Sequence, residues 1–590
     1  MENPELISKS AEACNLTKAD KIDLVSESCK PGNSAGTNEF ITMDVPFRKL
    51  MNVVDVSKIF ETTPRKIKET GFDIFDYEKV FDDEATRKLI REGNTIGCFY
   101  IESPGMRSLL KRLDCDTFEM LTAASSVIRP GVAESGMMRE FIERHKDPKR
   151  RKYLVPEMEK YLGETYGVMI YQEDVIKVAH HVVGLTLEEA DLLRRAMSGK
   201  MRSHKAMQMI IDKFFTCCKA KGYSDEVSQK LWKQIESFAG YAFCKAHSAS
   251  FAVLSFQVAY LKAHYPAEFM AAVLSNGGGF YSSAVYITEC QRLCLTVLLP
   301  SVNESIYDYQ GRAKEIRIGF MAVKDMERST ADLIVKERER NGKYVSLADF
   351  LVRTKFGYRQ TETLIKCGAM DCFNQTRPTL LRITDIYFNN KKLLDESENN
   401  LFVNETIKLE SEVVTEREFG IEEKCTYEYE TFGYMISRHP LEFFEEQISI
   451  PSIIKSTEML KYNKRRIKMI GWYMTSKRIK TSKGDVMKFL SLEDLCGTFE
   501  AVIFPEAYQK YAELTMSMGP YLIEGTVDAE NGNNIIVEKL SVLTAEQAKS
   551  ITQKDRTNAN FFGDVEKPAT FDEVLLVNSL GRERLISAYL

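Results

Sequence analysis

The stretch ESFAGYAFCKAHSASFAVLSFQVAYLKAHYPAEFMAAVLS, residues 236–275, determines how the rest of the chain is organised. It opens with aromatic residues and glycine, passes through the short segment CKAHS (244–248), and continues through small and apolar residues to Pro266. Four apolar side chains recur there at helical spacing: Phe251, Leu254, Val258 and Leu261. This spacing predicts a buried helix.

Lys245 and His247 come just before the run of apolar residues. Free backbone N–H groups and the positive end of the helix dipole favour anions at such a position. A lysine, an imidazole and an aromatic ring at a helix entrance suit a triphosphate that carries a sugar and a base. The same residues also fit a capped core helix whose polar side chains are only solvated. The residues alone leave both interpretations open.

The segment FAGYAFCKAHSASF (238–251) resembles the fingers of the alpha subunit of bacterial DNA polymerase III, the family C DNA polymerases. Cys244 replaces the family's usual asparagine, and Phe251 replaces its usual tyrosine. Four further stretches appear in the family's order: IGCFYIESPGMRSLLKRL (96–113), SSVIRPGVAESGMMREFIERH (125–145), TYGVMIYQEDVIKVAHHVVGLTLEEADLLRRAMSGK (165–200) and FGYMISRHPLE (432–442). The resemblance covers roughly 44–543 and corresponds to the polymerase's C-terminal half. The GFY stretch at 279–281 is closest to the error-prone branch.

The resemblance implies a nucleotide site, because arginines and lysines of these motifs surround the incoming triphosphate in the family. Its nucleotide-binding residues would be Arg129, Arg194, Arg195, Lys200, Tyr241, Lys245 and His247. Without the resemblance, a basic helix face such as that of 194–200 would be interpreted as a solvated surface. His180 and His181 lie within an apolar run and are expected to be structural.

Two-metal nucleotidyl transfer requires carboxylates that hold two Mg²⁺ ions. The resemblance places Asp44 at the last of three catalytic, metal-binding aspartates of the palm, although the following residues 45–48 depart from the family's pattern. An ordinary surface aspartate is the alternative. The family's paired Asp-x-Asp and its N-terminal phosphoesterase domain have no counterpart in the sequence.

We therefore expect a DNA-directed DNA polymerase, acting in DNA replication or translesion repair, that binds dNTP and template-primer DNA. It should be inactive until a separate N-terminal half supplies the palm and shares Mg²⁺ with it. The alternative is a non-catalytic DNA-binding or assembly factor derived from a polymerase.

The expected fold class is α+β and multidomain, with mainly helical fingers and helix-hairpin-helix regions followed by an all-β OB-fold barrel. Residues 465–543 alternate apolar and polar, with turns at 482–484 and 496–497, and this pattern predicts the barrel strands. The expected boundaries are a weakly ordered leader (1–40), a palm remnant or connector (41–81), fingers (82–275), a helix-hairpin-helix region (276–375), a helical connector (376–464), an OB-fold domain (465–543) and a C-terminal tail (544–590).

DNA contacts are expected in two of these regions. A helix-hairpin-helix turn at Lys366 and Gly368 would bind the duplex backbone through N–H groups, with a purely structural helix pair as the alternative. In the barrel, charge and stacking surface for a single strand would come from Trp472, Tyr473, Lys477, Arg478 and Lys480. Glu416 to Phe419 is at most a degraded version of the family's sliding-clamp peptide.

The composition limits the possible settings of the protein. A formal net charge of −5 over 590 residues excludes nucleic-acid binding by the whole surface, so any DNA contact needs local basic patches. The 13 cysteines include no CxxC pair, which favours reduced thiols and a cytoplasmic location. No apolar run reaches the length of a membrane span, and no signal peptide is evident.

Overall fold

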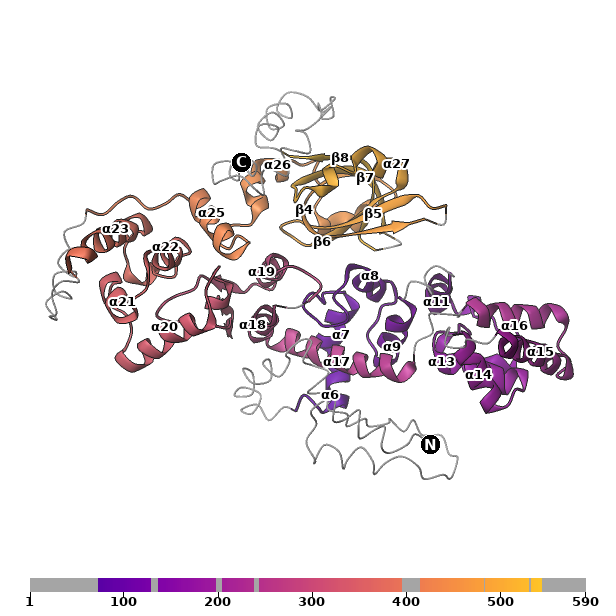
Figure 1. The fold of residues 1–590 in the computed structure, drawn as a ribbon. Helices are drawn as coiled ribbons and strands as arrows, with labels where there is room; N and C mark the ends of the chain where they lie inside the picture. The colour runs from indigo at the N-terminus through magenta and orange to yellow at the C-terminus, as the bar shows by residue number, and fades with distance from the viewer. Residues whose placement is uncertain are drawn as a thin grey trace, which may run out of the picture. The chain divides into compact units, whose positions relative to one another are not determined.

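The computed structural model describes residues 73–128, 136–197, 204–237, 244–277, 279–394, 414–481, 483–529 and 532–543. The chain divides into two compact units, Met1–Gly71 and Phe72–Leu590, and every described residue belongs to the second. Helical regions come first and an all-β barrel comes last, which confirms the predicted fold class (Figure 1). Within the described ranges, no helix is long and apolar enough to cross a membrane, and all cysteines are free thiols.

The predicted buried helix is α17, Lys245–His264, and its side chains from Ala252 onward are almost all buried. Such all-round burial is typical of a helix in the middle of a domain. The same group of helices contains α6 (Tyr77–Asp82), α7 (Glu84–Arg91), α8 (Pro104–Arg112), α9 (Phe118–Val127) and α18 (Pro266–Asn276). Of these, α8 contacts α7 and α9, and the other four contact α17 itself. Helices α6 to α9 begin at capping residues whose side chains accept a backbone N–H from the first turn: Asp76, Asp83, Ser103 and Thr117.

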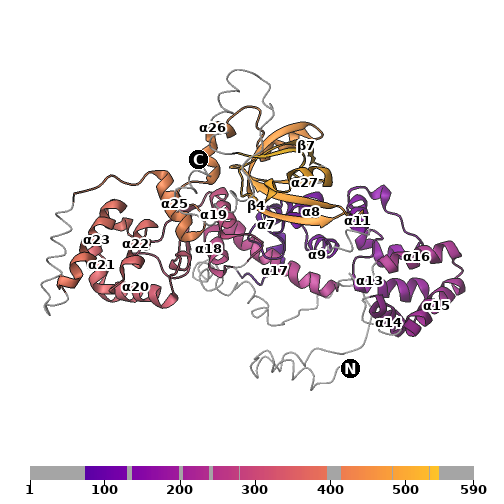
Figure 2. The same cartoon turned by 45° about the horizontal axis from the view of Figure 1, so that its top comes forward.

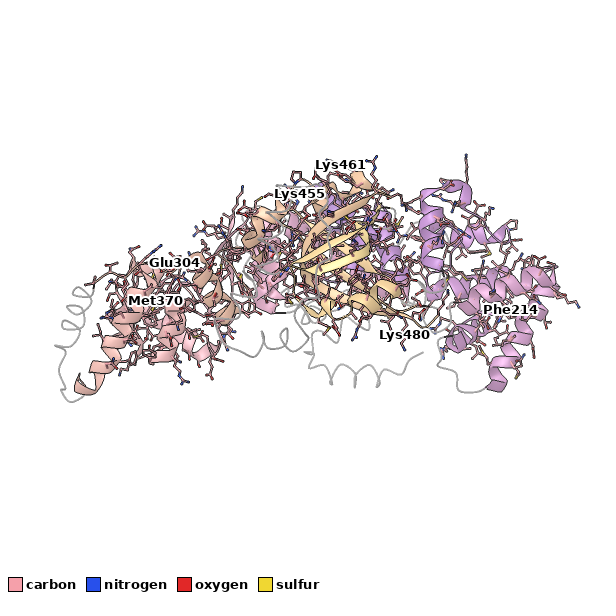
Figure 3. All side chains as sticks on the ribbon, turned by 90° about the horizontal axis from the view of Figure 1, so that it is seen from above. Phe214, Glu304, Met370, Lys455, Lys461 and Lys480 are labelled. Atoms are coloured by element: carbon pink, nitrogen blue, oxygen red, sulfur yellow. The ribbon has the colours of Figure 1, made fainter. Side chains whose placement is uncertain are left out.

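A second group of helices has a hydrophobic core of its own around Phe214 (Figure 3). Its elements are α11 (Met137–Lys146), α12 (Glu157–Leu162), α13 (Gln172–Lys177), the π-helical turn η4 (Val178–Val183), α14 (Leu187–Met197), α15 (His204–Ala220) and α16 (Asp225–Ser237). Nδ1 of His180 lies 2.7 Å from the Leu185 carbonyl, and the ring of His181 stacks on Tyr161. Both histidines thus have local structural partners.

The region after α18 contains α19 (Ser283–Arg292) and a small three-stranded sheet, ordered β1-β3-β2, of Thr296–Leu298, Gln310–Arg312 and Glu315–Arg317. Four helices then enclose another core: α20 (Arg328–Asn341), α21 (Leu347–Thr354), α22 (Tyr358–Lys366) and α23 (Arg377–Leu394). α25 (Ile421–Phe432) and the short α26 (Glu445–Ile448) lead to the barrel.

The barrel closes in the order β4-β5-β6-β8-β7 (Figures 1 and 2). Its strands are β4 (Arg466–Lys480), β5 (Val486–Glu493), β6 (Thr498–Ile503), β7 (Tyr521–Asp528) and β8 (Asn534–Val542). β4 pairs antiparallel with both β5 and β7, and β6 pairs parallel with β8. A helix, α27 (Pro505–Tyr511), follows the third strand. This five-stranded Greek-key barrel is the OB-fold that the sequence predicted.

Alternation along the strands explains which residues form the barrel core. On β5, Leu490 and Leu492 are fully buried inside the barrel, so the residues between and beside them point outward. Gly484, which lies in the predicted turn between β4 and β5, adopts a positive φ of 89°, which favours glycine. Lys480, at the end of β4 next to this turn, is exposed (Figure 3).

Candidate nucleotide and nucleic-acid sites

The start of α13 contacts both Arg194 and Lys245, which are some fifty residues apart in the sequence. The Glu173 carboxylate accepts the backbone N–H of Lys245 at 3.0 Å, at the first residue of α17. The neighbouring Gln172 accepts a hydrogen bond of 2.8 Å from the Arg194 guanidinium. The ammonium group of Lys245 lies 5.4 Å from the centre of the Tyr171 ring. Arg194 and Lys245, predicted to share a site, are thus held by adjacent residues.

Carboxylates already pair with the cations of this cluster. The Lys245 ammonium lies 2.6 Å from Glu164, and Asp191 contacts Arg194 at 2.8 Å and Arg195 at 2.7 Å. Burial acts to raise the pKa of Asp191, but the two guanidinium groups outweigh it and hold this pKa below its usual value. An anionic ligand would therefore have to replace Glu164 and Asp191 as partners of these cations.

His247 is exposed on the first turn of α17. Its ring meets the Phe251 ring edge-on at 4.4 Å, and Phe251 stacks on Tyr100 at 4.7 Å. At the next residue, the buried hydroxyl of Ser248 lies 2.7 Å from that of Ser126 near the end of α9. The start of α17 therefore presents an imidazole on an aromatic base that is fixed to the neighbouring helix.

Four residues predicted for the catalytic and nucleotide sites lie outside the described residues: Asp44, Arg129, Lys200 and Tyr241. Their predicted roles remain predictions, as do those of Arg194, Arg195, Lys245 and His247. In the part of the chain that the structure describes, no group of three or more His, Cys, Asp or Glu side chains is arranged to hold a metal ion.

Sequence reasoning missed the residues that build the cluster: Glu164, Gln172, Glu173 and Asp191. All four lie in or beside the quoted stretch 165–200. Its YQED tetrapeptide was the available signal, because two carboxylates and an amide at a helix start suit capping and cation binding. Asp174, the last of the four, accepts the backbone N–H groups of Ile170 and Tyr171, both at 3.0 Å. Its burial raises the pKa of this carboxyl to about 6.

The predicted phosphate contact at Lys366 and Gly368 falls on a packed turn. Lys366 is only 9% exposed, and its ammonium pairs with Glu362. Gly368 is buried, and a side chain added there would collide with the Arg377 guanidinium at 2.4 Å. Arg377 itself bonds to Asp371 and to the Lys366 carbonyl. A phosphate would have to displace these contacts, and the role of this turn in DNA binding stays a prediction.

An exposed turn one helix earlier is the better candidate for the helix-hairpin-helix contact. Lys355 and Gly357 are exposed between α21 and α22, and Arg359 is exposed in the first turn of α22, whereas Phe356 is buried and anchors the turn. The Gly357 N–H donates to the Gln360 side chain at 3.3 Å. Backbone N–H groups with adjacent cations bind duplex phosphates without reading sequence.

The barrel separates the five predicted DNA-binding residues into two groups. Lys477, Arg478 and Lys480 are exposed, and among the described residues none of them has a salt-bridge partner. Tyr473 is half-buried, with its hydroxyl 3.2 Å from that of Ser476. Trp472, only 7% exposed, belongs to a hydrophobic cluster beside the barrel. Stacking on a base would require this ring to leave the cluster, so its role in DNA binding stays a prediction.

The degraded clamp peptide does not form a free linear segment. The backbone of Glu416 bonds to the hydroxyls of Thr376 and Thr379, and the Phe419 ring packs on Tyr427 at 5.1 Å. Clamp binding through this segment would require these contacts to break.

Comparison with known proteins shows which proteins this chain is similar to. Residues 57–222 match the family model of the bacterial DNA polymerase III alpha subunit finger domain, and residues 294–380 match a helix-hairpin-helix motif. The DNA polymerase III subunit alpha of Aquifex aeolicus is 34% identical over 465 residues, which is 78% of this chain and 39% of the relative. The corresponding proteins of Saccharopolyspora erythraea and Staphylococcus aureus (strain COL) are 31% and 32% identical over 76% and 87% of this chain, and over 40% and 48% of those relatives.

This chain is a relative of the bacterial DNA polymerase III alpha subunit. It spans less than half the length of the curated alpha subunits that it matches. The finger-domain match includes α13 and α14 but ends before α17. The longer alignments to the alpha subunits include α17 as well.

Proposed function

We propose that this chain supplies the nucleotide-binding fingers and the DNA-binding modules of a DNA-directed DNA polymerase that acts in replication or translesion repair. The observation that carries the proposal is the joining of Arg194 and Lys245 through Gln172 and Glu173. The relatives of this chain share the name DNA polymerase III subunit alpha, which supports the same class of reaction.

The cation cluster would bind the triphosphate by exchanging its present carboxylate partners for phosphate oxygens. In the free protein Glu164 and Asp191 neutralise Lys245, Arg194 and Arg195. An incoming triphosphate offers several negative oxygens and can replace these carboxylates with stronger charge-assisted bonds. Preorganised cations that face the charge developing on the phosphates lower the barrier to transfer. The exposed imidazole of His247 would lie beside the sugar.

The carboxylates that hold the catalytic metal would come from outside the described residues. Mg²⁺, when bound, would neutralise charge between the primer hydroxyl and the triphosphate. The described residues do not form a site for it, so we derive no step through the metal from them. The proposal places the palm carboxylates on a separate N-terminal half, to which Asp44 would add one ligand.

The DNA contacts would come from two exposed basic segments. The turn at Lys355–Arg359 would hold the duplex backbone, and the end of β4 would hold a single strand through Lys477, Arg478 and Lys480. Both sets of contacts use charge and backbone N–H groups, so binding should weaken as salt rises.

A second candidate function is that of a non-catalytic DNA-binding or assembly factor. The observation that favours it is the complete pairing of Lys245 and Arg194 with carboxylates of the same chain. Under this alternative the cluster is an internal salt-bridge network that no nucleotide displaces.

Equilibrium titration of the full chain with dNTP and Mg²⁺ separates the two functions. We expect Lys245→Ala and Arg194→Ala each to weaken binding about tenfold or more, because each removes a charge-assisted hydrogen bond. Glu164→Gln should strengthen binding several-fold, since it frees Lys245 from its present partner. Lys230→Ala is the matched control, because Lys230 pairs with Glu226 on an exposed fingers helix. Equal affinity in all four variants would favour the assembly factor.

A further inference from the structure

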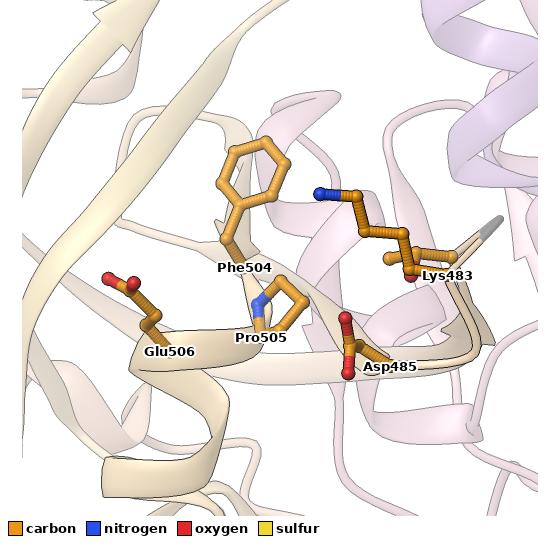
Figure 4. Close-up of a pocket in the computed structure, with 6 residues that line it drawn as sticks. Lys483, Asp485, Phe504, Pro505 and Glu506 are labelled. Atoms are coloured by element: carbon orange, nitrogen blue, oxygen red, sulfur yellow. The ribbon is translucent and has the colours of Figure 1, made fainter.

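A pocket of about 420 Å³ lies where the β4–β5 hairpin meets the start of α27. Six residues line it: Thr481, Lys483, Asp485, Phe504, Pro505 and Glu506 (Figure 4). None of them belongs to the residues that the sequence assigned to DNA binding. The space is large enough for one nucleoside and is open to solvent.

An exposed aromatic ring stands at the same place. Phe504 is 46% exposed, although a phenylalanine at the end of a barrel strand would ordinarily be packed. In Figure 4 the Phe504 ring and the Lys483 side chain rise from the pocket floor, whereas the carboxylates of Asp485 and Glu506 lie lower, on either side of Pro505. The pocket thus combines a flat apolar surface, an ammonium group and two carboxylates.

The surroundings of the pocket add positive charge. Lys477, Arg478 and Lys480 lead along β4 to the hairpin, and these cations and Lys483 lack salt-bridge partners among the described residues. This pattern is opposite to that of the fingers, where carboxylates pair with Lys245 and Arg194. An unpaired row of cations attracts a polyanion, and its field is not cancelled locally.

The outward side chains of the neighbouring strands are closed to solvent. Ser491 and Glu493 on β5 and Val502 on β6 are only 8%, 2% and 7% exposed. Glu493 also accepts a 2.8 Å bond from Arg292. A strand of nucleic acid therefore has no open surface on this face of β5 and β6, whereas the hairpin end is exposed.

We propose that the pocket binds one base of a single-stranded nucleic acid, with the base stacked on Phe504. This inference rests on the proposed function, whose single-strand contact it assigns to a specific site. The backbone phosphates would follow Lys483 and Lys480. Stacking on an aromatic ring is available to every base, so the site accepts many sequences.

The carboxylates of the pocket add a preference among bases. Asp and Glu side chains accept hydrogen bonds from the amino group of cytosine, whereas thymine offers a carbonyl oxygen at the corresponding position. Asp485 and Glu506 should therefore favour oligo(dC) over oligo(dT) of equal length. Glu506→Gln and Asp485→Asn should each reduce this preference.

Fluorescence anisotropy of labelled oligo(dC) and oligo(dT) tests the proposal by measuring their binding to the full chain at several salt concentrations. Phe504→Ala should weaken oligo(dC) binding about five- to a hundredfold, the range expected for loss of one stacked base. Phe280→Ala, which removes a ring that is 50% exposed outside the barrel, should leave it unchanged. Lys483→Ala should weaken binding and reduce its salt dependence, whereas Lys510→Ala on α27 should not.

A further variant keeps an aromatic ring in the pocket. The indole introduced by Phe504→Trp should lose fluorescence when oligo(dC) binds. If the chain binds oligonucleotides and Phe504→Ala binds as tightly as the parent, this inference is wrong. If the chain binds no oligonucleotide at any salt concentration, the proposed single-strand contact itself is overturned.

Discussion

Neighbouring side chains at the start of α13 carry out different tasks. Tyr171 lies beneath the Lys245 ammonium, Gln172 orients Arg194, and Glu173 caps α17. Asp174 points back and fixes the backbone that carries the other three, through two N–H groups. The candidate nucleotide site therefore depends on a residue that would not touch the nucleotide.

The buried carboxyl of Asp174 should make the stability of the fingers depend on pH. Burial raises its pKa to about 6 from an ordinary 3.8, although Lys177 lies 3.7 Å away. The folded state then binds the proton more tightly than the unfolded state. Its contribution to stability is complete below about pH 4 and is lost as the pH rises through 6.

Between pH 4 and pH 6, we expect the free energy of unfolding of the unsubstituted protein to fall relative to that of Asp174→Asn. The fall should reach up to about 3 kcal/mol. Denaturation followed by Trp232 fluorescence measures this, in a background with Trp472→Phe that leaves Trp232 as the only native tryptophan. Parallel stability curves for parent and variant would show that Asp174 titrates normally.

At the scale of the element, α17 is an apolar helix with one buried cation. The Lys262 ammonium donates to the carbonyls of Asn94 and Ile96, both at 2.7 Å, and to Glu289 at 2.6 Å. Burial acts to raise the pKa of Glu289, but Lys262 and Arg292 hold it below its usual value. The helix therefore has a fixed register against α7 and α19, because sliding would leave these charges unpaired.

Lys262→Met should lower the free energy of unfolding by about 3–5 kcal/mol, since it leaves Glu289 buried with one partner fewer. Adding Glu289→Gln should recover part of this loss, because the uncompensated charge is removed. Calorimetry of both variants measures the effect, with Lys230→Met on an exposed helix as the control. A loss below 1 kcal/mol for Lys262→Met would mean that water replaces the lost partner.

At the scale of the whole molecule, the described residues combine the cation cluster at the start of α13, a helix-hairpin-helix turn and an OB-fold barrel. Each module presents basic groups, while the formal net charge of the chain is −5. The proposed binding surfaces are therefore local, and an acidic remainder would repel nucleic acid.

The purified chain should show no primer extension, and activity should appear when a polypeptide with the N-terminal domain and palm of the family is added. Two-metal transfer depends on carboxylates that this proposal assigns to that partner. In the reconstituted pair, Asp44→Asn should abolish extension and leave DNA binding nearly intact, because it removes a metal ligand. A gel-based extension assay measures this, with Asp225→Asn on an exposed fingers helix as the control. Full activity of Asp44→Asn would identify Asp44 as a surface residue, and extension by the chain alone would place the catalytic carboxylates within it.

The sequence alone determined the order of the modules and the type of their elements. Apolar spacing predicted α17, and alternating residues with turns at 482–484 and 496–497 predicted the barrel, because periodicity follows from local backbone geometry. It also indicated Arg194 and Lys245 as members of one candidate site, through motifs that resemble a known family.

Only the tertiary structure decided which side chains are available to a ligand. It buried Trp472 and Gly368, left Phe504 exposed, and paired Lys245 with Glu164 from a distant segment. A strand pattern assigns a residue to one of two faces, but packing of other segments decides whether that face meets solvent. Exposure and charge pairing depend on contacts between residues far apart in the chain, and no local pattern encodes them.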